Sequence, residues 1–127
     1  MLNRIMKQIL IFIFCVLSFQ AFAMEKKTTF DADLFKKAQS EGKIVVVSSW
    51  IKYCSSCASQ MKVLNKVEDD FKNIVYLNFD VRNKDISNLL KVEYQTTLLI
   101  FKNNKEVYRS IGETTKEKIY KAINSSI

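Results

Sequence analysis

Two cysteines, Cys54 and Cys57, lie two residues apart in the segment Trp50-Ile-Lys-Tyr-Cys-Ser-Ser-Cys57. At this spacing the two sulfur atoms can close a small disulfide ring. A helix that begins at Cys54 directs its unpaired backbone N–H groups and the positive end of its dipole towards this sulfur, which favours the thiolate over the thiol. Because the thiolate is the nucleophile in thiol–disulfide exchange, the pair predicts redox chemistry in which Cys54 attacks and Cys57 resolves the mixed disulfide.

Other interpretations of the cysteine pair imply other functions. A structural disulfide is disfavoured because so short a loop constrains the unfolded chain little. A zinc site needs two more ligands, yet the chain has no histidine and only one further cysteine, Cys15, in an apolar N-terminal segment. Two alternatives stay open: a metal-binding or metal-delivery protein that uses the same two thiols, and a redox-inactive domain that binds a partner.

The composition excludes several classes of protein. The absence of histidine rules out Ser-His and Cys-His nucleophile systems and every histidine-containing metal site. The net charge is +7, but the basic residues are scattered among acidic ones, and no arginine-rich run indicates nucleic-acid binding. We therefore expect no cofactor, no resident metal ion and no nucleic-acid partner.

The N-terminal segment has the pattern of a secretory signal peptide. Arg4 and Lys7 precede an apolar run over residues 8–19, and Ala21-Phe22-Ala23 places small residues three and one before a cleavage site. The run is shorter than the ~20 residues of a membrane span, although an uncleaved anchor is the alternative. We expect a signal peptide over residues 1–23, cleaved after Ala23, and a single exported or periplasmic domain over residues 24–127.

Hydrophobic spacing predicts the elements that position the cysteine pair. A buried strand over 44–50 leads into the pair, and one amphipathic helix follows it from Cys54 to Phe71. The remaining elements are a helix over 31–41 ended by Gly42, a strand over 74–79, a short helix over 85–92, a strand over 98–101, a turn at Asn103-Asn104, a strand over 106–111, and a final helix that opens with the capping-box pattern Thr114-Thr115-Lys116-Glu117.

The order of these elements predicts the fold class. Strands that alternate with helices imply parallel crossovers, and the closing hairpin adds antiparallel strands. We therefore expect an α/β fold in which helices flank both faces of a mixed central sheet of four strands. Residues 25–30 are candidates for a fifth, short strand at the sheet edge.

The segment from Trp50 to Cys57 resembles the W-x-x-x-C-x-x-C segment of the thioredoxin superfamily. Residues 76–80 resemble the central strand of that family, residues 97–103 the strand after its cis-proline, and Gly112 the glycine after its last strand. The opening helix and residues 41–47 are more similar to the C-terminal domain of the periplasmic reductase DsbD than to cytoplasmic thioredoxin. The resemblance implies a three-layer thioredoxin-like fold and a thiol:disulfide oxidoreductase.

The resemblance also implies which residues bind the substrate. Trp50 and Tyr53 are candidates for a rim that contacts the substrate, although Trp50 is also expected to pack against the start of the helix. Gln95, Thr96 and Gly112 match the loops that lie beside the cysteines, where backbone groups bind an extended substrate. Thr96 stands at the position of the cis-proline, and since a non-proline cis bond costs about 3 kcal/mol, we expect the Gln95–Thr96 bond to be trans.

Other departures from the family pattern surround the cysteines. Ser48 and Tyr76 replace a buried acid and a lysine that relay a proton, and losing both together avoids an orphaned buried charge. The family's proline shields the sulfurs from metals, so Thr96 favours the metal-binding alternative. Because the residues between the cysteines include no histidine and the chain has no substrate-binding helical insertion, we expect a reductase. We also expect it to be a monomer. Its partners are then exported protein disulfides or thiols and an upstream electron donor or acceptor.

Overall fold

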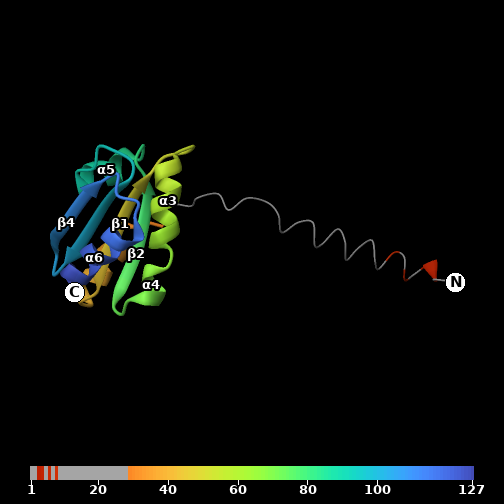
Figure 1. The fold of residues 1–127 in the computed structure, drawn as a ribbon, viewed down its shortest axis with the longest axis horizontal. Coiled ribbons are helices and arrows are strands. Elements are labelled where there is room, and N and C mark those ends of the chain that lie inside the picture. The colour runs from red at the N-terminus through yellow and green to blue at the C-terminus, as the bar shows by residue number, and fades with distance from the viewer. Residues whose placement is uncertain (1–2, 5, 7, 9–28) are drawn as a thin grey trace.

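The computed structural model describes residues 3–4, 6, 8 and 29–127 (Figure 1). Apart from four isolated positions, the predicted signal peptide lies outside the described residues, as do Cys15, the cleavage site after Ala23 and most of the candidate edge strand over 25–30. Within the described part of the chain, no helix is both long enough and apolar enough to cross a membrane.

A mixed four-stranded sheet forms the middle layer, in the order β2-β1-β3-β4. β1 (Ile44–Trp50) pairs in parallel with β2 (Ile74–Asp80) and antiparallel with β3 (Thr97–Lys102). β3 in turn pairs antiparallel with β4 (Lys105–Ile111) through the turn at Asn103-Asn104, whose φ angles of 52° and 61° suit a tight hairpin. The four strands confirm the predicted α/β fold with a mixed central sheet.

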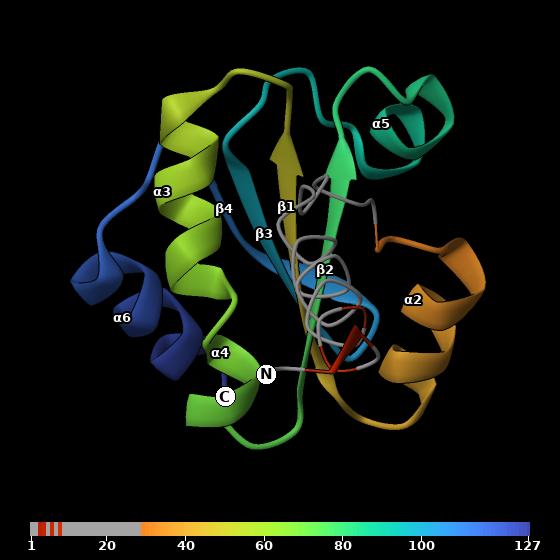
Figure 2. The same cartoon turned by 90° about the vertical axis from the view of Figure 1, so that its right-hand side faces the viewer.

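Helices cover both faces of the sheet, as Figure 2 shows. α2 (Ala32–Ser40) and α5 (Lys84–Leu90) lie on one face. α3 (Ser55–Leu64), α4 (Val67–Asp70) and α6 (Lys116–Ser126) lie on the other. This arrangement buries β1 along its whole length, which explains its continuous run of apolar residues.

Successive side chains of β1 enter opposite hydrophobic layers, because side chains alternate across a strand. Val45 and Val47 pack in the layer under α2 and α5, together with Phe79. Ile44 and Val46 pack in the layer under α3, α4 and α6. The side of β1 that holds Ile44 and Val46 also holds Ser48 and Trp50, and therefore faces the helix that carries the cysteines.

The single helix predicted from Cys54 to Phe71 is wrong, because the chain forms two helices with a break at Asn65-Lys66. The N–H of Asn65 still donates to the carbonyl of Met61 (2.9 Å), whereas the N–H of Lys66 turns to the carbonyl of Val63 (3.2 Å). The apolar spacing continues across the break because the last residue of α3 and the first residue of α4 are both fully buried in the same layer. Periodicity alone therefore could not reveal the change of direction.

The predicted capping box at the start of α6 is also wrong. Thr115 is the residue that precedes the helix, and its side chain makes no capping hydrogen bond to the helix. Instead, a carboxylate oxygen of Glu113 accepts hydrogen bonds from the backbone N–H of Thr114 (3.0 Å) and of Thr115 (2.9 Å). Glu113, which precedes the helix, thus takes the role that the capping-box pattern assigns to Glu117 inside the helix. These bonds, chiefly those from Thr115, hold the pKa of Glu113 below its usual value.

The outer edge of β2 is covered by side chains and by the start of the domain. Thr29 and Phe30 do not form a strand, but their N–H groups both donate to the carbonyl of Asn78, at 3.0 and 2.9 Å. The N–H of Asn78 donates to the hydroxyl of Thr29 (2.9 Å), and the N–H of Tyr76 donates to the carboxylate of Glu68 (2.7 Å). The described part of the chain therefore has a four-stranded sheet, with this segment beside β2 in place of a fifth strand.

Candidate active site

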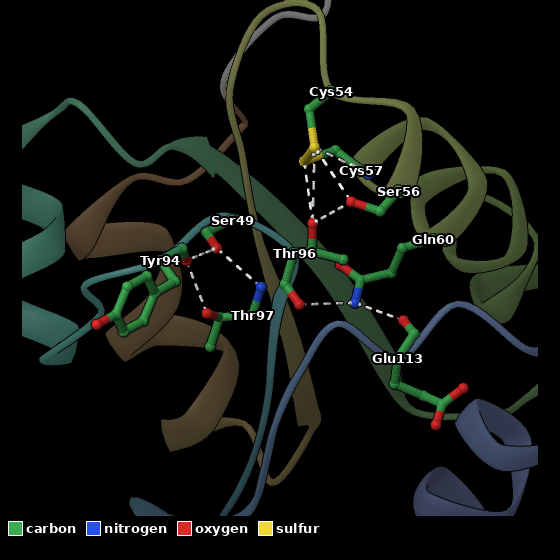
Figure 3. Close-up of a disulfide and its surroundings, with 9 residues drawn as sticks. All are labelled: Ser49, Cys54, Ser56, Cys57, Gln60, Tyr94, Thr96, Thr97 and Glu113. Carbon is green, nitrogen blue, oxygen red and sulfur yellow. Dashed lines mark hydrogen bonds between the residues drawn. A yellow bond between two sulfur atoms is a disulfide. The ribbon is translucent and has the colours of Figure 1, made fainter.

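Cys54 caps the N-terminus of α3. Its backbone is extended, and its Sγ accepts a hydrogen bond from the N–H of Cys57 at 3.2 Å. The two residues are joined by a disulfide, with their Cα atoms 5.3 Å apart (Figure 3). Cys57 is fully buried, whereas Cys54 is partly exposed, so a thiol or disulfide from outside reaches Cys54 first. The predicted location of the pair at the start of a helix is confirmed.

Thr96 lies beside the disulfide, directly before β3. The Gln95–Thr96 bond is trans, as expected, and Thr96 has a φ of 59°. A β-branched residue rarely adopts this left-handed conformation, which costs about 1–3 kcal/mol. The neighbouring segments hold it in place, because its N–H donates to the carbonyl of Ser49 and its own carbonyl accepts from the N–H of Gly112, both at 2.9 Å.

The hydroxyl of Thr96 contacts both halves of the cysteine pair. Its oxygen is 3.2 Å from the Sγ of Cys57 and 3.7 Å from the Sγ of Cys54. It also lies 2.9 Å from the hydroxyl oxygen of Ser56, which in turn is 3.3 Å from the Sγ of Cys54 (Figure 3). Ser56 is exposed and Thr96 is buried, so hydroxyl groups surround the sulfurs from the surface to the interior.

Gln60 is a residue of the site that the sequence analysis missed. It is fully buried on α3, and its side-chain N–H₂ donates to the carbonyl of Thr96 (3.2 Å) and to the carbonyl of Glu113 (2.8 Å). Figure 3 shows it spanning the two loops beside the disulfide. The sequence does contain a signal for this role. Gln60 is three residues after Cys57 and therefore lies on the inward face of the helix, where a buried polar side chain needs a hydrogen-bond partner.

Trp50 and Tyr53 lie in different surroundings. Trp50 is only 5% exposed, packs with Cys57 and Met61, and donates its indole N–H to the side chain of Asn78 at 2.9 Å. It therefore packs behind the disulfide at the start of the helix, as expected, and not on the surface. Tyr53 is fully exposed directly before Cys54, with a φ of 62°.

Gly112 and Gln95 complete the set of predicted site residues. Gly112 follows β4 with a φ of 83°, and its N–H reaches the carbonyl of Thr96, so the structure brings it to the site. Gln95 is exposed beside Thr96. Its backbone N–H and carbonyl have no hydrogen-bond partner among the described residues.

Comparison with known proteins places this geometry in a family. The sequence model of the thioredoxin family, described as Thioredoxin, matches residues 21–125. The chain belongs to the thioredoxin family. Its fold and its disulfide-linked cysteine pair at a helix N-terminus make it a thiol:disulfide oxidoreductase.

Individual thioredoxins are similar to this chain in sequence and in structure. Thioredoxin H-type from Fagopyrum esculentum is 27% identical over 88 residues, which cover 68% of this chain and 76% of that protein. Thioredoxin-1 from Saccharomyces cerevisiae is 29% identical over 82 residues, which cover 64% and 80%. The structure is similar to that of Trxlp from Edwardsiella tarda, with 25% identity, a TM-score of 0.67 and coverage of 72% of this chain and 92% of that one. Fasciola hepatica thioredoxin shares the fold, with 20% identity, a TM-score of 0.66 and coverage of 75% and 89%.

A neutral pair occupies the positions at which the thioredoxin resemblance implies an acid and a lysine. The hydroxyl oxygens of Ser48 and Tyr76 lie 2.7 Å apart, and Ser48 is fully buried. Burial raises the pKa of Tyr76 to about 12, so this side chain keeps its proton near neutral pH. This pair therefore offers the cysteines of this thioredoxin-family chain no carboxylate or ammonium group.

The metal-binding alternative gains no ligand from the fold. Among the described residues, no group of three or more cysteine, aspartate or glutamate side chains could hold a metal ion. Thr96 offers only a hydroxyl beside the two sulfurs. The arrangement suits thiol–disulfide exchange, for which two cysteines at a helix N-terminus suffice.

Proposed function

We propose that this chain is an exported reductase that transfers electrons to disulfides of other exported proteins. The observation that carries the proposal is the partial exposure of Cys54 at the start of α3, where its sulfur accepts a hydrogen bond from the N–H of Cys57 while Cys57 itself is fully buried. Export is supported by the charged and apolar pattern of residues 1–23. The reducing direction is supported by the absence of histidine between the two cysteines.

The proposed reaction begins from the reduced pair. The Cys54 thiolate attacks a substrate disulfide, forms a mixed disulfide and releases one substrate thiolate. The sulfur of Cys57 then attacks Cys54, which releases the second substrate sulfur and closes the Cys54–Cys57 disulfide. The substrate gains two electrons and the pair loses two, so a further exported or membrane-bound dithiol protein must reduce the pair again.

The substrate is proposed to bind along the exposed residues around Cys54. Tyr53 offers an exposed aromatic ring directly before the nucleophile. Of the two loop residues, Gln95 has free backbone groups among the described residues, whereas the N–H and carbonyl of Thr96 are already bonded to Ser49, Gly112 and Gln60. We therefore assign backbone pairing with an extended substrate to Gln95, and only side-chain contact to Thr96.

The reductase activity can be tested with insulin as the substrate. The purified protein with dithiothreitol should accelerate the reduction of insulin above the rate with dithiothreitol alone. Cys54→Ser should abolish this acceleration, and Ser55→Ala should retain it because no hydrogen bond joins Ser55 to either sulfur in the described structure. Equal rates for the protein and for Cys54→Ser would refute the activity.

The direction of electron flow needs a separate measurement. A titration against glutathione, with free thiols counted by alkylation, gives the reduction potential of the pair. A reductase should have a potential near that of thioredoxin, about −270 mV, and an oxidant should lie closer to about −120 mV. A value in the oxidant range would overturn the proposed direction while leaving the exchange chemistry intact.

Export and the partner proteins can be tested together in the native cells. Fractionation should place the protein outside the cytoplasm with Met24 as its first residue. Cys57→Ala cannot resolve mixed disulfides, so it should accumulate partners attached to Cys54. Adducts with cytoplasmic proteins and an intact N-terminus would contradict the proposal.

A further inference from the structure

We propose that the hydroxyl groups of Ser56 and Thr96 form a relay that carries a proton between Cys57 and the sulfur attached to Cys54. This inference rests on the proposed exchange reaction and adds the route of its proton. The relay consists of residues that are not themselves redox active. It assigns a catalytic role to Thr96, whose hydroxyl touches both reacting sulfurs.

The hydroxyls of Thr96 and Ser56 link the sulfur of Cys57 to that of Cys54, to which the partner's sulfur is bonded in the mixed disulfide. The three steps of the relay are 3.2 Å from Cys57 Sγ to Thr96 Oγ1, 2.9 Å from Thr96 Oγ1 to Ser56 Oγ, and 3.3 Å from Ser56 Oγ to Cys54 Sγ (Figure 3). A hydroxyl both donates and accepts, so the chain can run in either direction. These distances belong to the disulfide-linked pair, which is the product of the proposed step, so the two hydroxyls lie beside the sulfurs as the ring closes.

The buried position of Cys57 creates the need for such a route. Cys57 has no exposed surface, so bulk water cannot take the proton that its thiol must lose before it attacks. The two sulfurs make hydrogen bonds only with Ser56, Thr96 and the N–H of Cys57 within the described structure. Ser48 and Tyr76 hydrogen bond to each other, and Tyr76 retains its own proton near neutral pH, so that pair does not supply the base.

The proposed step conserves atoms and electrons. In the mixed disulfide, Cys54 is bonded to the sulfur of a partner, which must approach from the exposed side, where Ser56 also lies. Cys57 attacks the sulfur of Cys54, the bond between Cys54 and the partner breaks, and its electron pair leaves with the partner sulfur. The proton of Cys57 passes to Thr96 as the hydroxyl proton of Thr96 passes to Ser56 and that of Ser56 passes to the departing thiolate.

The test isolates the resolving step with glutathione as the partner. The reduced protein is mixed with glutathione disulfide, quenched with acid, and the glutathione adduct on Cys54 is followed by mass spectrometry. Trp50, the sole tryptophan, packs on Cys57 and provides a fluorescence signal for ring closure. We expect Thr96→Val to slow resolution by about 100-fold, the lower end for a positioned proton carrier. Ser56→Ala should slow it by about 10-fold, because water can partly replace an exposed hydroxyl.

The double variant separates a relay from two independent effects. Breaking a chain once stops transfer along it, so Thr96→Val combined with Ser56→Ala should resolve no more slowly than Thr96→Val alone. The wild type should show a solvent deuterium isotope effect on resolution that Thr96→Val loses. Multiplicative slowing in the double variant, or an unchanged isotope effect, would overturn the relay.

Conservative variants control for folding. Thr96→Ser keeps the hydroxyl and should retain most of the rate. Ser55→Ala changes the neighbouring serine and should retain all of it. If Thr96→Val fails to fold, Ser56→Ala on the exposed side decides, and a rate equal to that of Ser55→Ala refutes the relay. Because glutathione is the partner, the result is independent of the proposed reductase role, which the insulin assay and the reduction potential test separately.

Discussion

The hydroxyl oxygens of Ser48 and Tyr76 lie 2.7 Å apart and join β1 to β2 in the layer beneath α3. The thioredoxin resemblance implies a buried acid and a lysine at these two positions. One neutral hydrogen-bonded pair thus replaces one charged pair, and no buried charge is left without a partner. This contact predicts that the effect on stability of a substitution at either position depends on the residue at the other.

Exchange of the neutral pair for a charged one should show this dependence. Ser48→Asp alone places an unpaired charge in the interior and should lower the free energy of unfolding by about 3 kcal/mol or more. Tyr76→Lys alone places its charge at a partly buried position and should lower it by less. The double variant should recover most of the loss. Urea denaturation of the four proteins measures the coupling, and losses that simply add would show that the positions act independently.

Tyr76 should also make the protein less stable at alkaline pH. Its pKa is about 12 in the folded protein and about 10 in an unfolded chain. Between these values the unfolded chain loses the proton while the folded chain keeps it, so the free energy of unfolding falls as pH rises, by at most about 2.7 kcal/mol. Below pH ~10 both states are protonated and Tyr76 adds no pH dependence.

Denaturation of Tyr76→Phe between pH 9 and 11 tests this expectation. The variant should be less stable at neutral pH, because the hydroxyl of Ser48 loses its partner, but its stability should fall less steeply with pH. Tyr120→Phe is a comparison and not a null control: burial and the carboxylate of Asp70 also raise the pKa of Tyr120 to about 12, but at an exposed site where solvent screens the charges, so this variant should flatten the slope less than Tyr76→Phe does. An unchanged slope in Tyr76→Phe would contradict the assignment.

Gln60 should stabilise the two loops beside the disulfide. Gln60→Met removes both side-chain hydrogen bonds at similar volume and leaves the carbonyl of Glu113 with one fewer donor. We expect a loss of about 1–3 kcal/mol, measured by urea denaturation. Gln95→Met changes an exposed glutamine in the same region and should have little effect. Equal stability of the two variants would show that Gln60 does not stabilise the loops beside the disulfide.

Restoring the family's proline at Thr96 should destabilise this protein. Proline fixes φ near −65° and has no N–H, whereas Thr96 has a φ of 59° and donates its N–H to Ser49. Thr96→Pro should cost about 3 kcal/mol or more, seen as a lower melting temperature. Thr96→Ser preserves the N–H and should be close to the wild type. An unchanged or raised melting temperature for the proline variant would show that the loop accepts a second conformation.

Much of this fold follows from local patterns in the sequence. The run from Ile44 to Val47 is apolar because helices cover both faces of the strand, and recognising such a run needs no knowledge of the rest of the fold. The start of α3 at Cys54 and the turn at Asn103-Asn104 likewise follow from nearby residues. The end of α3 does not follow from these patterns, because the apolar spacing continues across the break at Asn65-Lys66.

The contacts within the site join segments that are far apart in the sequence, which explains why local patterns did not reveal these contacts. Gln60 and Glu113 are 53 residues apart, and Cys57 and Thr96 are 39 apart. The family resemblance brought Thr96 and Gly112 to the cysteines, but it did not indicate that the Thr96 hydroxyl would contact them. Nor did it reveal the left-handed backbone of Thr96, which hydrogen bonds from three other segments maintain.

The covering of β2 by Thr29, Phe30 and Glu68 has a consequence for the protein in a crowded compartment. An uncovered edge strand recruits strands from other molecules, which leads to aggregation. Here the N–H groups of Tyr76 and Asn78 are already bonded to side chains, and the carbonyl of Asn78 is bonded to the start of the domain. Trimming the chain to Asp31 would uncover this edge at Asn78, so resistance to self-association depends on residues that precede the first helix of the domain.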